Sequence, residues 1–261
     1  MLPSGELEQI KNEIHSIITS YGLAKVGYAP MEGIPVLGSV SRLGRGMNHA
    51  ISLLWEIPMQ AAYERSKVDR YYECMVHARS LQDEVATSIA DLIKDHGHHA
   101  LPVTIAFPMD RELITGQISH KAVAYQAGLG WIGKSSLLIT PEFGPRVRLC
   151  TVLTDVRLDQ GAKPLNNHCG ECTRCIDVCP IKAIKNNDPD HDPSDRAEVF
   201  DRMICHRREE QWLKRSPPKF CAQCVSTVHG ENRMSAVLPA ESTIFRNRHQ
   251  NGNIPAAPVV P

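Results

Sequence analysis

The chain has 261 residues, of which 42% are hydrophobic and 22% charged, the composition of an ordinary globular protein with room for one large domain or two small ones. Lysine plus arginine and aspartate plus glutamate each number 29, so the formal net charge is zero and no global basic field favours a polyanion such as tRNA. No apolar run approaches the ~18 residues of a membrane span, and no secretory signal opens the chain, so we expect a cytoplasmic protein with reduced thiols.

A helix, a strand and a loop are predicted first. Residues 4–21 carry apolar side chains at helical spacing, with Ser4 as the expected N-cap and Gly22 as the residue that ends the helix. Residues 24–28 alternate as a short strand does, and the glycine- and proline-containing stretch 30–46 indicates a loop.

A strand, a long helix and a further strand are predicted next. Residues 50–55 form a continuous apolar run, which is typical of a strand buried on both faces. Ser66 and Asp69 are spaced as a capping box at the start of a helix with one apolar face, which ends at Gly97. Residues 103–107 then alternate as a strand.

Residues 118–127 predict a short helix, and the glycine loop that follows (residues 128–135, GLGWIGKS) matches the pattern GxxxxGK[ST] of phosphate-binding loops. Such a loop must follow a strand and open a helix, so that backbone N–H groups and the helix dipole converge on phosphate. Here a helix precedes the loop, and residues 137–153 indicate two strands joined by a turn over residues 141–145. We therefore reject an ATPase. The loop still offers closely spaced glycines, at which a bulky ligand can approach the backbone, and one cation, Lys134.

Seven cysteines in the second half of the chain indicate iron–sulfur clusters. The spacing CxxCxxCxxxCP over residues 169–180 is that of two-cluster bacterial ferredoxins, in which three of these cysteines bind one [4Fe-4S] cube and the fourth binds the other. By this rule the first cysteine set is Cys169, Cys172 and Cys175, and the second cysteine set is Cys179, Cys205, Cys221 and Cys224. Two cubes need eight ligands, and Val228 occupies the position expected for the eighth.

The alternatives for these cysteines are structural zinc and disulfide bonds. Zinc sites usually combine two close cysteine pairs across a modest loop, so closely packed third and fourth cysteines have no role in one tetrahedral site. Disulfides are disfavoured in the reducing compartment expected above. Cys74, in the long helix, is interpreted as a buried structural thiol. The spacing therefore predicts two clusters, one of them with an incomplete cysteine set.

The remaining segments are short or polar. Residues 161–168 read as a linker, residues 181–185 as a brief helix, and residues 196–207 as a helix that carries Cys205. Aromatic residues nearly vanish after residue 231, and the chain ends in a proline-rich tail that we expect to be mobile.

Five motifs together carry a resemblance to a known family. In chain order they are AGLGWIGK (127–134), LLI (137–139), PEFG (141–144), LTD (153–155) and CGECTRCIDVCP (169–180). Their order and separation, between about residues 5 and 228, resemble those of the iron–sulfur, cobalamin-dependent epoxyqueuosine reductases and their uncharacterised relatives. The reductive dehalogenases resemble the chain more distantly.

The resemblance implies an α+β fold in which a corrinoid-binding core, similar to the nitroreductase fold, precedes a bacterial ferredoxin-like two-cluster module. It divides the chain into a core (1–160), the module (161–231) and the tail (232–261). In this family one cube passes single electrons to a base-off cobalamin, which then reduces the substrate by two electrons. An electron donor such as ferredoxin or flavodoxin is implied. The residues that fall near the corrinoid by position are Lys121, Gly130, Lys134, Ser135 and Arg148.

The chain departs from the family pattern at three places. The position of the proton-donating aspartate, thirteen residues before the AGLGWIGK motif, is Ile114, so His120 and Tyr125 are the candidates to replace it. The eighth cysteine is Val228, so His229, another group or solvent caps the open iron, or that cube is absent. The helical-repeat extension of the tRNA-modifying enzymes is missing, which with the zero net charge argues against tRNA as a partner.

We therefore predict a corrinoid-dependent reductase that passes electrons from [4Fe-4S] clusters to a core-bound cobalamin and an unknown small substrate. The alternative is a [4Fe-4S] electron-transfer protein without corrinoid, which the lost aspartate and the lost cysteine favour. Epoxyqueuosine reduction is weakened most by Ile114.

Overall fold

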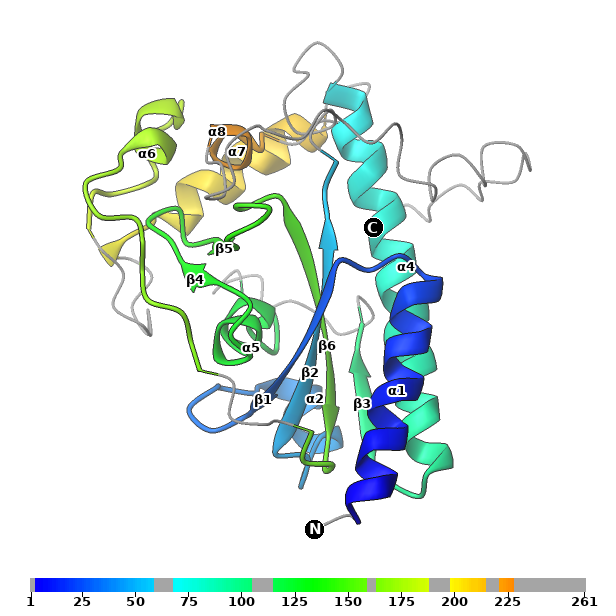
Figure 1. Ribbon diagram of the computed structural model, residues 1–261. Helices are drawn as coiled ribbons and strands as arrows, with labels where there is room; N and C mark the ends of the chain where they lie inside the picture. The colour runs from blue at the N-terminus through cyan, green and yellow to red at the C-terminus, as the bar shows by residue number, and fades with distance from the viewer. Residues whose placement is uncertain are drawn as a thin grey trace.

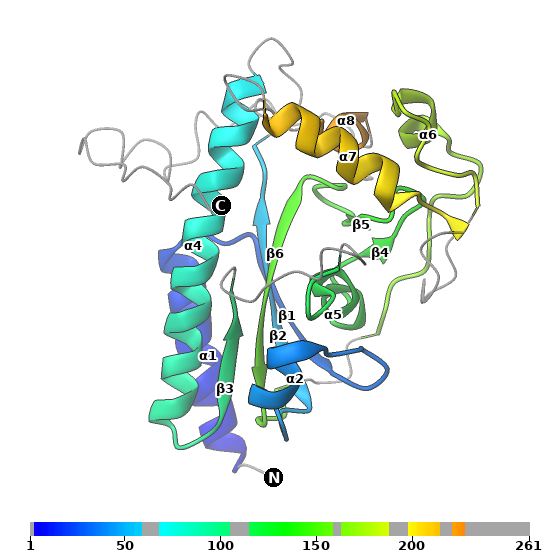
Figure 2. The same cartoon turned by 180° about the vertical axis from the view of Figure 1, so that it is seen from behind.

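A four-stranded antiparallel sheet in the order β1-β2-β6-β3 lies at the centre of the protein. The computed structural model describes residues 3–58, 68–104, 115–158, 163–187, 198–214 and 221–227. The strands are β1 (Lys25–Pro30), β2 (His49–Glu56), β6 (Val147–Thr154) and β3 (Ala100–Val103). Helices α1 (Ser4–Ser20) and α4 (Val68–Asp95) lie on one face of the sheet, and α5 (His120–Gln126) lies on the other (Figure 1, Figure 2). This is the α+β class that the sequence resemblance implies.

Alternate side chains of β2 build two cores, one on each face of the sheet. Ile51 and Leu53 join the core formed with α1 and α4, whereas Ala50 and Leu54 join the core formed with α5. Strand β2 pairs with β1 on one side and with β6 on the other, and all of its residues between His49 and Glu56 are buried. The predicted strand buried on both faces is therefore confirmed, although it lies in an antiparallel sheet.

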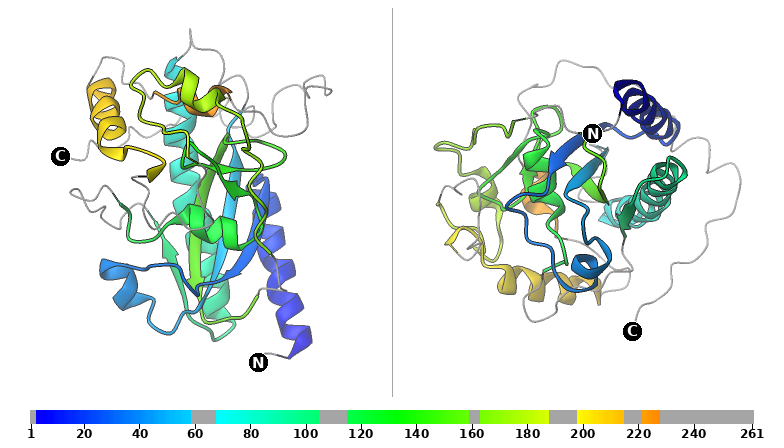
Figure 3. Two further views of the ribbon diagram at one scale, coloured as in Figure 1. Left: turned by 90° about the vertical axis from the view of Figure 1, so that its left-hand side faces the viewer. Right: turned by 90° about the horizontal axis from the view of Figure 1, so that it is seen from below.

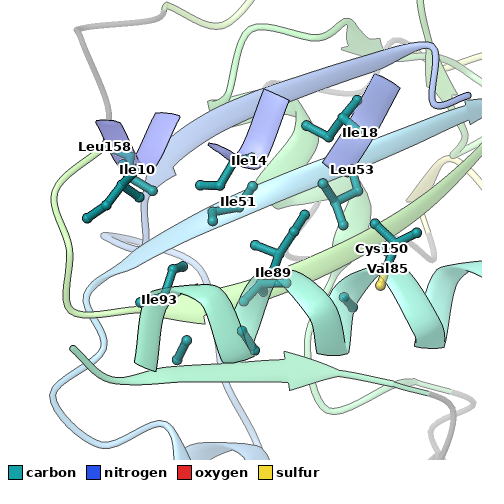
Figure 4. Packing of buried hydrophobic residues seen from close by; sticks show 14 of the residues in the cluster. Ile10, Ile14, Ile18, Ile51, Leu53, Val85, Ile89, Ile93, Cys150 and Leu158 are labelled. Carbon is teal, nitrogen blue, oxygen red and sulfur yellow. The ribbon is translucent and has the colours of Figure 1, made fainter. Parts of the chain in front are cut away.

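The larger core is made by branched aliphatic side chains of the two long helices. In Figure 4 these side chains converge on Ile51 and Leu53 of β2, and the view from below in Figure 3 shows both helices on the same side of the sheet. The helical side chains are Ile10, Ile14 and Ile18 of α1 and Val85, Ile89 and Ile93 of α4, each at most 4% exposed. Burying one such side chain contributes about 1.5–3 kcal/mol, so the apolar stripes read from the sequence hold both helices in place.

The second face carries the glycine loop. Helix α5 is capped by Ser119, whose Oγ accepts a hydrogen bond from the backbone N–H of Ala122 (3.3 Å), and it ends before Gly128, which has a φ of +71°. Within the loop, β4 (Trp131–Ile132) pairs with β5 (Leu138–Ile139). Because a strand and not a helix follows Lys134, the loop lacks the helix N-terminus that a phosphate-binding loop needs.

Two sequence predictions in the first half are wrong in detail. Residues 30–46 were predicted as loop, but α2 (Gly38–Leu43) forms there because Val40 is fully buried in the second core. The N-cap of α1 is Pro3 and not Ser4, which is already helical. Strand β3 covers residues 100–103, earlier than predicted, and residues 105–107, like Ser66, lie outside the described residues.

The second half also differs from prediction in three places. Residues 181–185 are not helical, because Lys182 has a φ of +51° and Ile184 bridges Phe200 as a strand residue does. Helix α7 (Arg202–Leu213) begins later than residue 196. The two predicted strands after the glycine loop are present as β5 and β6, with the turn between them, but they do not pair as a hairpin, since β5 pairs with β4 and β6 pairs with β2 and β3. The proline-rich tail lies outside the described residues, and within them no helix is long and apolar enough to cross a bilayer.

Two of the family-like motifs have structural roles. In the LTD motif, Asp155 accepts hydrogen bonds from the backbone N–H of His99 (3.0 Å) and contacts its Nδ1 (2.7 Å), while the Thr154 hydroxyl donates to the His99 carbonyl (2.9 Å). These contacts fasten the end of β6 to the start of β3. In the PEFG motif, Glu142 pairs with Lys25 of β1, and the motif forms the turn after β5.

Candidate functional site

The seven cysteines of the C-terminal segment lie beyond the end of the sheet at which β6 begins. Helices α6 (Arg174–Val178), α7 and α8 (Gln223–Thr227) lie together there, with β4 and β5 between them and α5 (Figure 1, Figure 2). Cys175 is on α6, Cys205 on α7 and Cys224 on α8, and their side chains join one small apolar cluster. No disulfide joins any two of the nine cysteines, all of which lie within the described residues.

Electrostatic interactions between the thiols divide them into the two sets predicted from the spacing. Burial is the main cause that raises the pKa of Cys175 to about 11, and the charges of Cys169 and Cys172 are the next largest causes. Burial is likewise the main cause that raises the pKa of Cys205 to about 11, and the charges of Glu209 and of two members of the second cysteine set add to it. Burial and the other thiols of the second set also raise the pKa of Cys224 to about 12, with a further contribution from Cys175. The two sets are therefore distinct but adjoin each other.

The donor chemistry of both sets fits [4Fe-4S] clusters. In the described part of the chain, no three Cys, His, Asp or Glu side chains converge on one point as ligands of a single metal ion do. A cuboidal cluster makes a different demand, because each thiolate binds its own iron. The raised pKa values of Cys175, Cys205, Cys221 and Cys224 keep these four thiols protonated at neutral pH, so cluster binding would release their protons. Val228 and His229, which bear on the missing eighth ligand, lie outside the described residues.

Lys134 joins the glycine loop to the first cysteine set. Its side chain is only 4% exposed, and its Nζ donates hydrogen bonds to the Gly170 carbonyl (2.6 Å) and to Asn186 Oδ1 (3.1 Å), with the Cys172 carbonyl 3.5 Å away. Sequence resemblance assigned Lys134 to the corrinoid. Its ammonium instead lies against the backbone of the predicted cluster loop.

The space around the loop's glycines is filled by the protein itself. A Cβ on Gly130 would lie 2.2 Å from the carbonyl oxygen of Ile139 in β5. A Cβ on Gly133 would lie 2.8 Å from Cγ1 of Ile139 and 3.3 Å from the Sγ of Cys169. The glycines therefore allow β5 and the first cysteine set to approach the loop, and the Trp131 ring, whose centroid is 5.0 Å from that of His168, covers the same junction.

A cavity of about 370 Å³ lies between α4, α5 and the first half of β6. Its lining combines apolar side chains from β5 and β6 with charged side chains from α4, α5 and β6. The polar and charged lining side chains are Arg79, Gln82, Asp83, Thr104, His120, Lys121 and Arg148, and the apolar ones include Val103, Leu137, Leu138, Val147 and Leu149. Apolar walls combined with a few convergent polar groups are common in small-molecule sites.

Arg148 is a partly buried cation of the cavity wall. Burial lowers the pKa of its guanidinium, and the charge of Arg79 lowers it further. Within the part of the chain that the structure describes, its Nε has no hydrogen-bond partner. Arg148 also interacts with Tyr71 of α4, whose pKa burial raises and which in turn interacts with Cys224. The cavity therefore adjoins the second cysteine set through Tyr71.

The two candidate proton donors occupy different places. His120 lines the cavity, its Nδ1 lies 2.8 Å from the Thr151 hydroxyl, and burial, followed by the charge of Arg148, lowers its pKa to about 4. It is therefore neutral at physiological pH. The Tyr125 side chain is 8% exposed and packs in the second core, outside the cavity lining, and burial raises its pKa. Ile114, where the family has its aspartate, lies outside the described residues.

The structure brings together only part of the predicted corrinoid site. Lys121 and Arg148 line the cavity, and Lys121 donates a hydrogen bond to the Ser136 carbonyl. Ser135 is buried in the glycine loop and, like Gly130 and Lys134, is not part of the cavity wall. A complete corrinoid is larger than the described cavity, so part of it would lie outside that cavity.

Three polar residues of α4 that line the cavity were missed by sequence reasoning. Arg79, Gln82 and Asp83 have the spacing i, i+3 and i+4, which places them on one helical face. Gln82 donates a hydrogen bond to the Leu149 carbonyl (2.9 Å) and thereby fixes this face against β6. The spacing alone could show that these side chains lie together, but not that they face a cavity.

Sequence comparison finds relatives over a limited part of the chain. No family model matches the chain. The chain is 47% identical over 70 residues to the epoxyqueuosine reductase of Bacillus cereus, and this match covers 27% of this chain and 18% of that enzyme. The epoxyqueuosine reductase of Synechocystis is likewise 47% identical over 70 residues, which are 24% of its length. The matched part is thus a quarter or less of each relative.

Comparison with solved structures extends over most of the chain. A reductive dehalogenase whose structure was interpreted in terms of B12-dependent dehalogenation matches with a TM-score of 0.63 at 17% identity, over 82% of this chain and 30% of that one. The epoxyqueuosine reductase of Streptococcus thermophilus matches with a TM-score of 0.54 at 17% identity, over 88% of this chain and 68% of that one. At these identities the comparison establishes the shared fold.

Proposed function

We propose that this chain, a relative of the epoxyqueuosine reductases with the fold of the reductive dehalogenases, is an iron–sulfur reductase that delivers electrons from two [4Fe-4S] clusters to the cavity beside β6. The observation that carries the proposal is the division of seven cysteines into two adjoining sets, one of which lies next to the cavity wall. In this arrangement a small substrate would be reduced in the cavity, and a ferredoxin or flavodoxin would supply the electrons.

The two cysteine sets have different relations to the cavity. The second cysteine set is complete, and Tyr71 interacts both with its Cys224 and with Arg148 in the cavity wall. The first set contacts the glycine loop instead, through the Lys134 hydrogen bonds and the approach of Cys169 to Gly133. Electrons would therefore enter at the first set and leave towards the cavity from the second.

The cavity residues would bind the substrate and control protons. Arg79 of α4, Lys121 of α5 and Arg148 of β6 supply positive charge to the cavity, and apolar side chains from β5 and β6 form another part of its wall. Because burial and the charge of Arg148 lower the pKa of His120 to about 4, its imidazole is neutral and would not supply the proton that substrate reduction requires. A corrinoid, when bound, would supply low-potential two-electron chemistry, and among the residues predicted to hold it, Lys121 and Arg148 line the cavity.

A second function is an electron carrier that binds no corrinoid. The observation that favours it is the limited space, since the described cavity is about 370 Å³ and the glycines of the loop face β5 and Cys169. In that case the core would serve as a support for the clusters, and the cavity would bind a smaller molecule.

The cluster assignment is tested by counting iron in single cysteine variants. After anaerobic purification and reconstitution, Cys224→Ser should lose the cluster of the second set and Cys172→Ser should lose that of the first. Cys150→Ser is the matched control, because Cys150 is a thiol buried between α4 and β3, away from both sets. Equal iron content in all three variants would contradict the assignment.

The corrinoid is tested by titration of the reconstituted protein with cob(II)alamin, followed by its paramagnetic spectrum. Loss of the axial nitrogen splitting near one equivalent would indicate base-off binding and would support the corrinoid-dependent reductase. Intact clusters without binding would favour the electron carrier.

A further inference from the structure

Glu209 is a carboxylate that lies beside the second cysteine set. It follows Cys205 by one turn of α7, and its Oε1 accepts a hydrogen bond from the backbone N–H of Cys221 (3.1 Å), twelve residues further along the chain. Burial and then the charge of Glu209 raise the pKa of Cys205 to about 11, and burial and the same charge raise the pKa of Cys221. Glu209 therefore contacts one ligand of the predicted second cluster and interacts electrostatically with two.

Only one of the two carboxylate oxygens of Glu209 is bonded. Its Oε2 is buried and has no hydrogen-bond partner in the described part of the chain. The two basic neighbours on α7 have other contacts, since Arg208 lies over the Trp212 ring, 4.8 Å from its centroid, and His206 lies 3.5 Å from Glu210. Burial raises the pKa of Glu209, and the backbone hydrogen bond and these two basic groups oppose that rise. The basic groups thus weaken the field of the carboxylate without pairing with it directly.

A carboxylate at this place disfavours the reduced form of the second cluster. Reduction adds one negative charge to a [4Fe-4S] cube, and a negative group nearby repels that charge. The bond to Glu209 also occupies the Cys221 N–H, so this donor is not available to a cluster sulfur, where a hydrogen bond would favour reduction. Both effects lower the reduction potential.

We propose that Glu209 is a positioning residue that lowers the reduction potential of the second cluster, through its negative charge and through its bond to the Cys221 amide. The inference rests on the proposed function, in which the second set passes electrons to the cavity. A lower potential makes this cluster a stronger reductant, which suits the step that delivers electrons to a substrate.

The test is a redox titration of the full, cluster-reconstituted chain, followed by paramagnetic resonance at about pH 8.5, where carboxyl groups are ionised. Glu209→Gln keeps an oxygen that can accept the Cys221 N–H but removes the charge. Reduction of the second cluster should then become roughly tenfold more favourable, which raises its potential by about 60 mV. Glu209→Asp keeps the charge and should shift the potential by less than half as much. Glu210→Gln is the matched control, because Glu210 is the next residue of α7 but is exposed, so solvent screens its charge.

Two further measurements make the titration interpretable. The signal of the second cluster is identified in Cys172→Ser, which should lose only the first cluster. Iron content establishes that each variant at Glu209 carries its clusters.

An unchanged potential of the second cluster in iron-loaded Glu209→Gln would overturn the proposal. An equal shift in Glu209→Asp or in Glu210→Gln would do so too, because the effect would then not come from the charge at this position. Loss of the second cluster from Glu209→Gln would assign Glu209 a purely structural role at Cys221, which also contradicts the proposal. Failure of the proposed function is detected separately, because the iron content of the wild type and of Cys224→Ser tests the cluster assignment without any change at Glu209.

Discussion

Lys134→Met should release the first cysteine loop from the core. Two well-formed hydrogen bonds from the Lys134 ammonium, at 2.6 Å to Gly170 and 3.1 Å to Asn186, are lost. Hydrogen bonds to charged groups contribute about 1.5–3 kcal/mol each, but both acceptor residues are exposed, so water replaces the lost donor and the low end applies. We therefore expect about 2–3 kcal/mol, which makes opening of the loop roughly 30- to 150-fold more favourable.

Two measurements check this expectation. Iron release to a chelator under anaerobic conditions should accelerate, and hydrogen exchange in residues 169–173 should accelerate with it, because the Cys172 amide is bonded to the Cys169 carbonyl (2.9 Å) within the same loop. Lys182→Met is the matched control, since Lys182 is an exposed lysine of the same segment. If Lys134→Met exchanges and releases iron as the wild type does, the buried lysine does not hold the loop and the reasoning fails.

Three further predictions follow from single residues. His120 has a pKa of about 4 in the folded protein and 6.5 when unfolded, so the folded state binds fewer protons between these values and stability falls as the pH drops from 6.5 to 4. In urea titrations His120→Gln should remove this loss of stability, which is on the order of 1–2 kcal/mol after allowance for water at the cavity wall. An unchanged pH profile of stability would contradict the assignment. Gly130→Ala places a Cβ 2.2 Å from the Ile139 carbonyl oxygen and should destabilise the protein by at least ~2 kcal/mol. In the control variant Gly5→Ala the new Cβ has no atom within 4 Å, so α1 should be stabilised by up to ~1 kcal/mol. Equal melting temperatures of the two variants would refute the contact at Gly130. Val228→Cys should raise iron content or slow cluster loss in air, and no change in either means that another position supplies the eighth ligand.

The fold follows from patterns that the sequence displays directly. The isoleucines of α1 recur at helical spacing and are buried, and the unbroken apolar run of β2 is the strand with both faces covered. Short elements were less predictable. Helix α2 depends on the burial of Val40, and residues 181–185 fail to form a helix because Lys182 adopts a left-handed conformation. Both outcomes are decided by tertiary contacts that local sequence does not contain.

The cysteine sets could be predicted because ligand spacing along the chain is itself the signal. The residues around them could not, since their roles depend on which segment lies opposite. Lys134 follows a glycine in a loop whose sequence pattern is typical of a ligand-binding loop, yet its hydrogen-bond partners Gly170 and Asn186 lie 36 and 52 residues away in the sequence. Gly130 is explained by the approach of Ile139, which is close in sequence but reaches it only through the pairing of β4 with β5.

Within the proposed function, the positions of the two cysteine sets explain why one set lacks a fourth cysteine. The complete second set adjoins Tyr71 and the cavity, where the electrostatic environment must be fixed for substrate reduction. The incomplete first set lies on the far side of the glycine loop, where the buried ammonium of Lys134 approaches its backbone. A positive charge there favours the reduced form of a nearby cluster, as does replacement of a thiolate by a neutral ligand. Both features would make the first set the easier one to reduce, which suits it to accept electrons from an external donor.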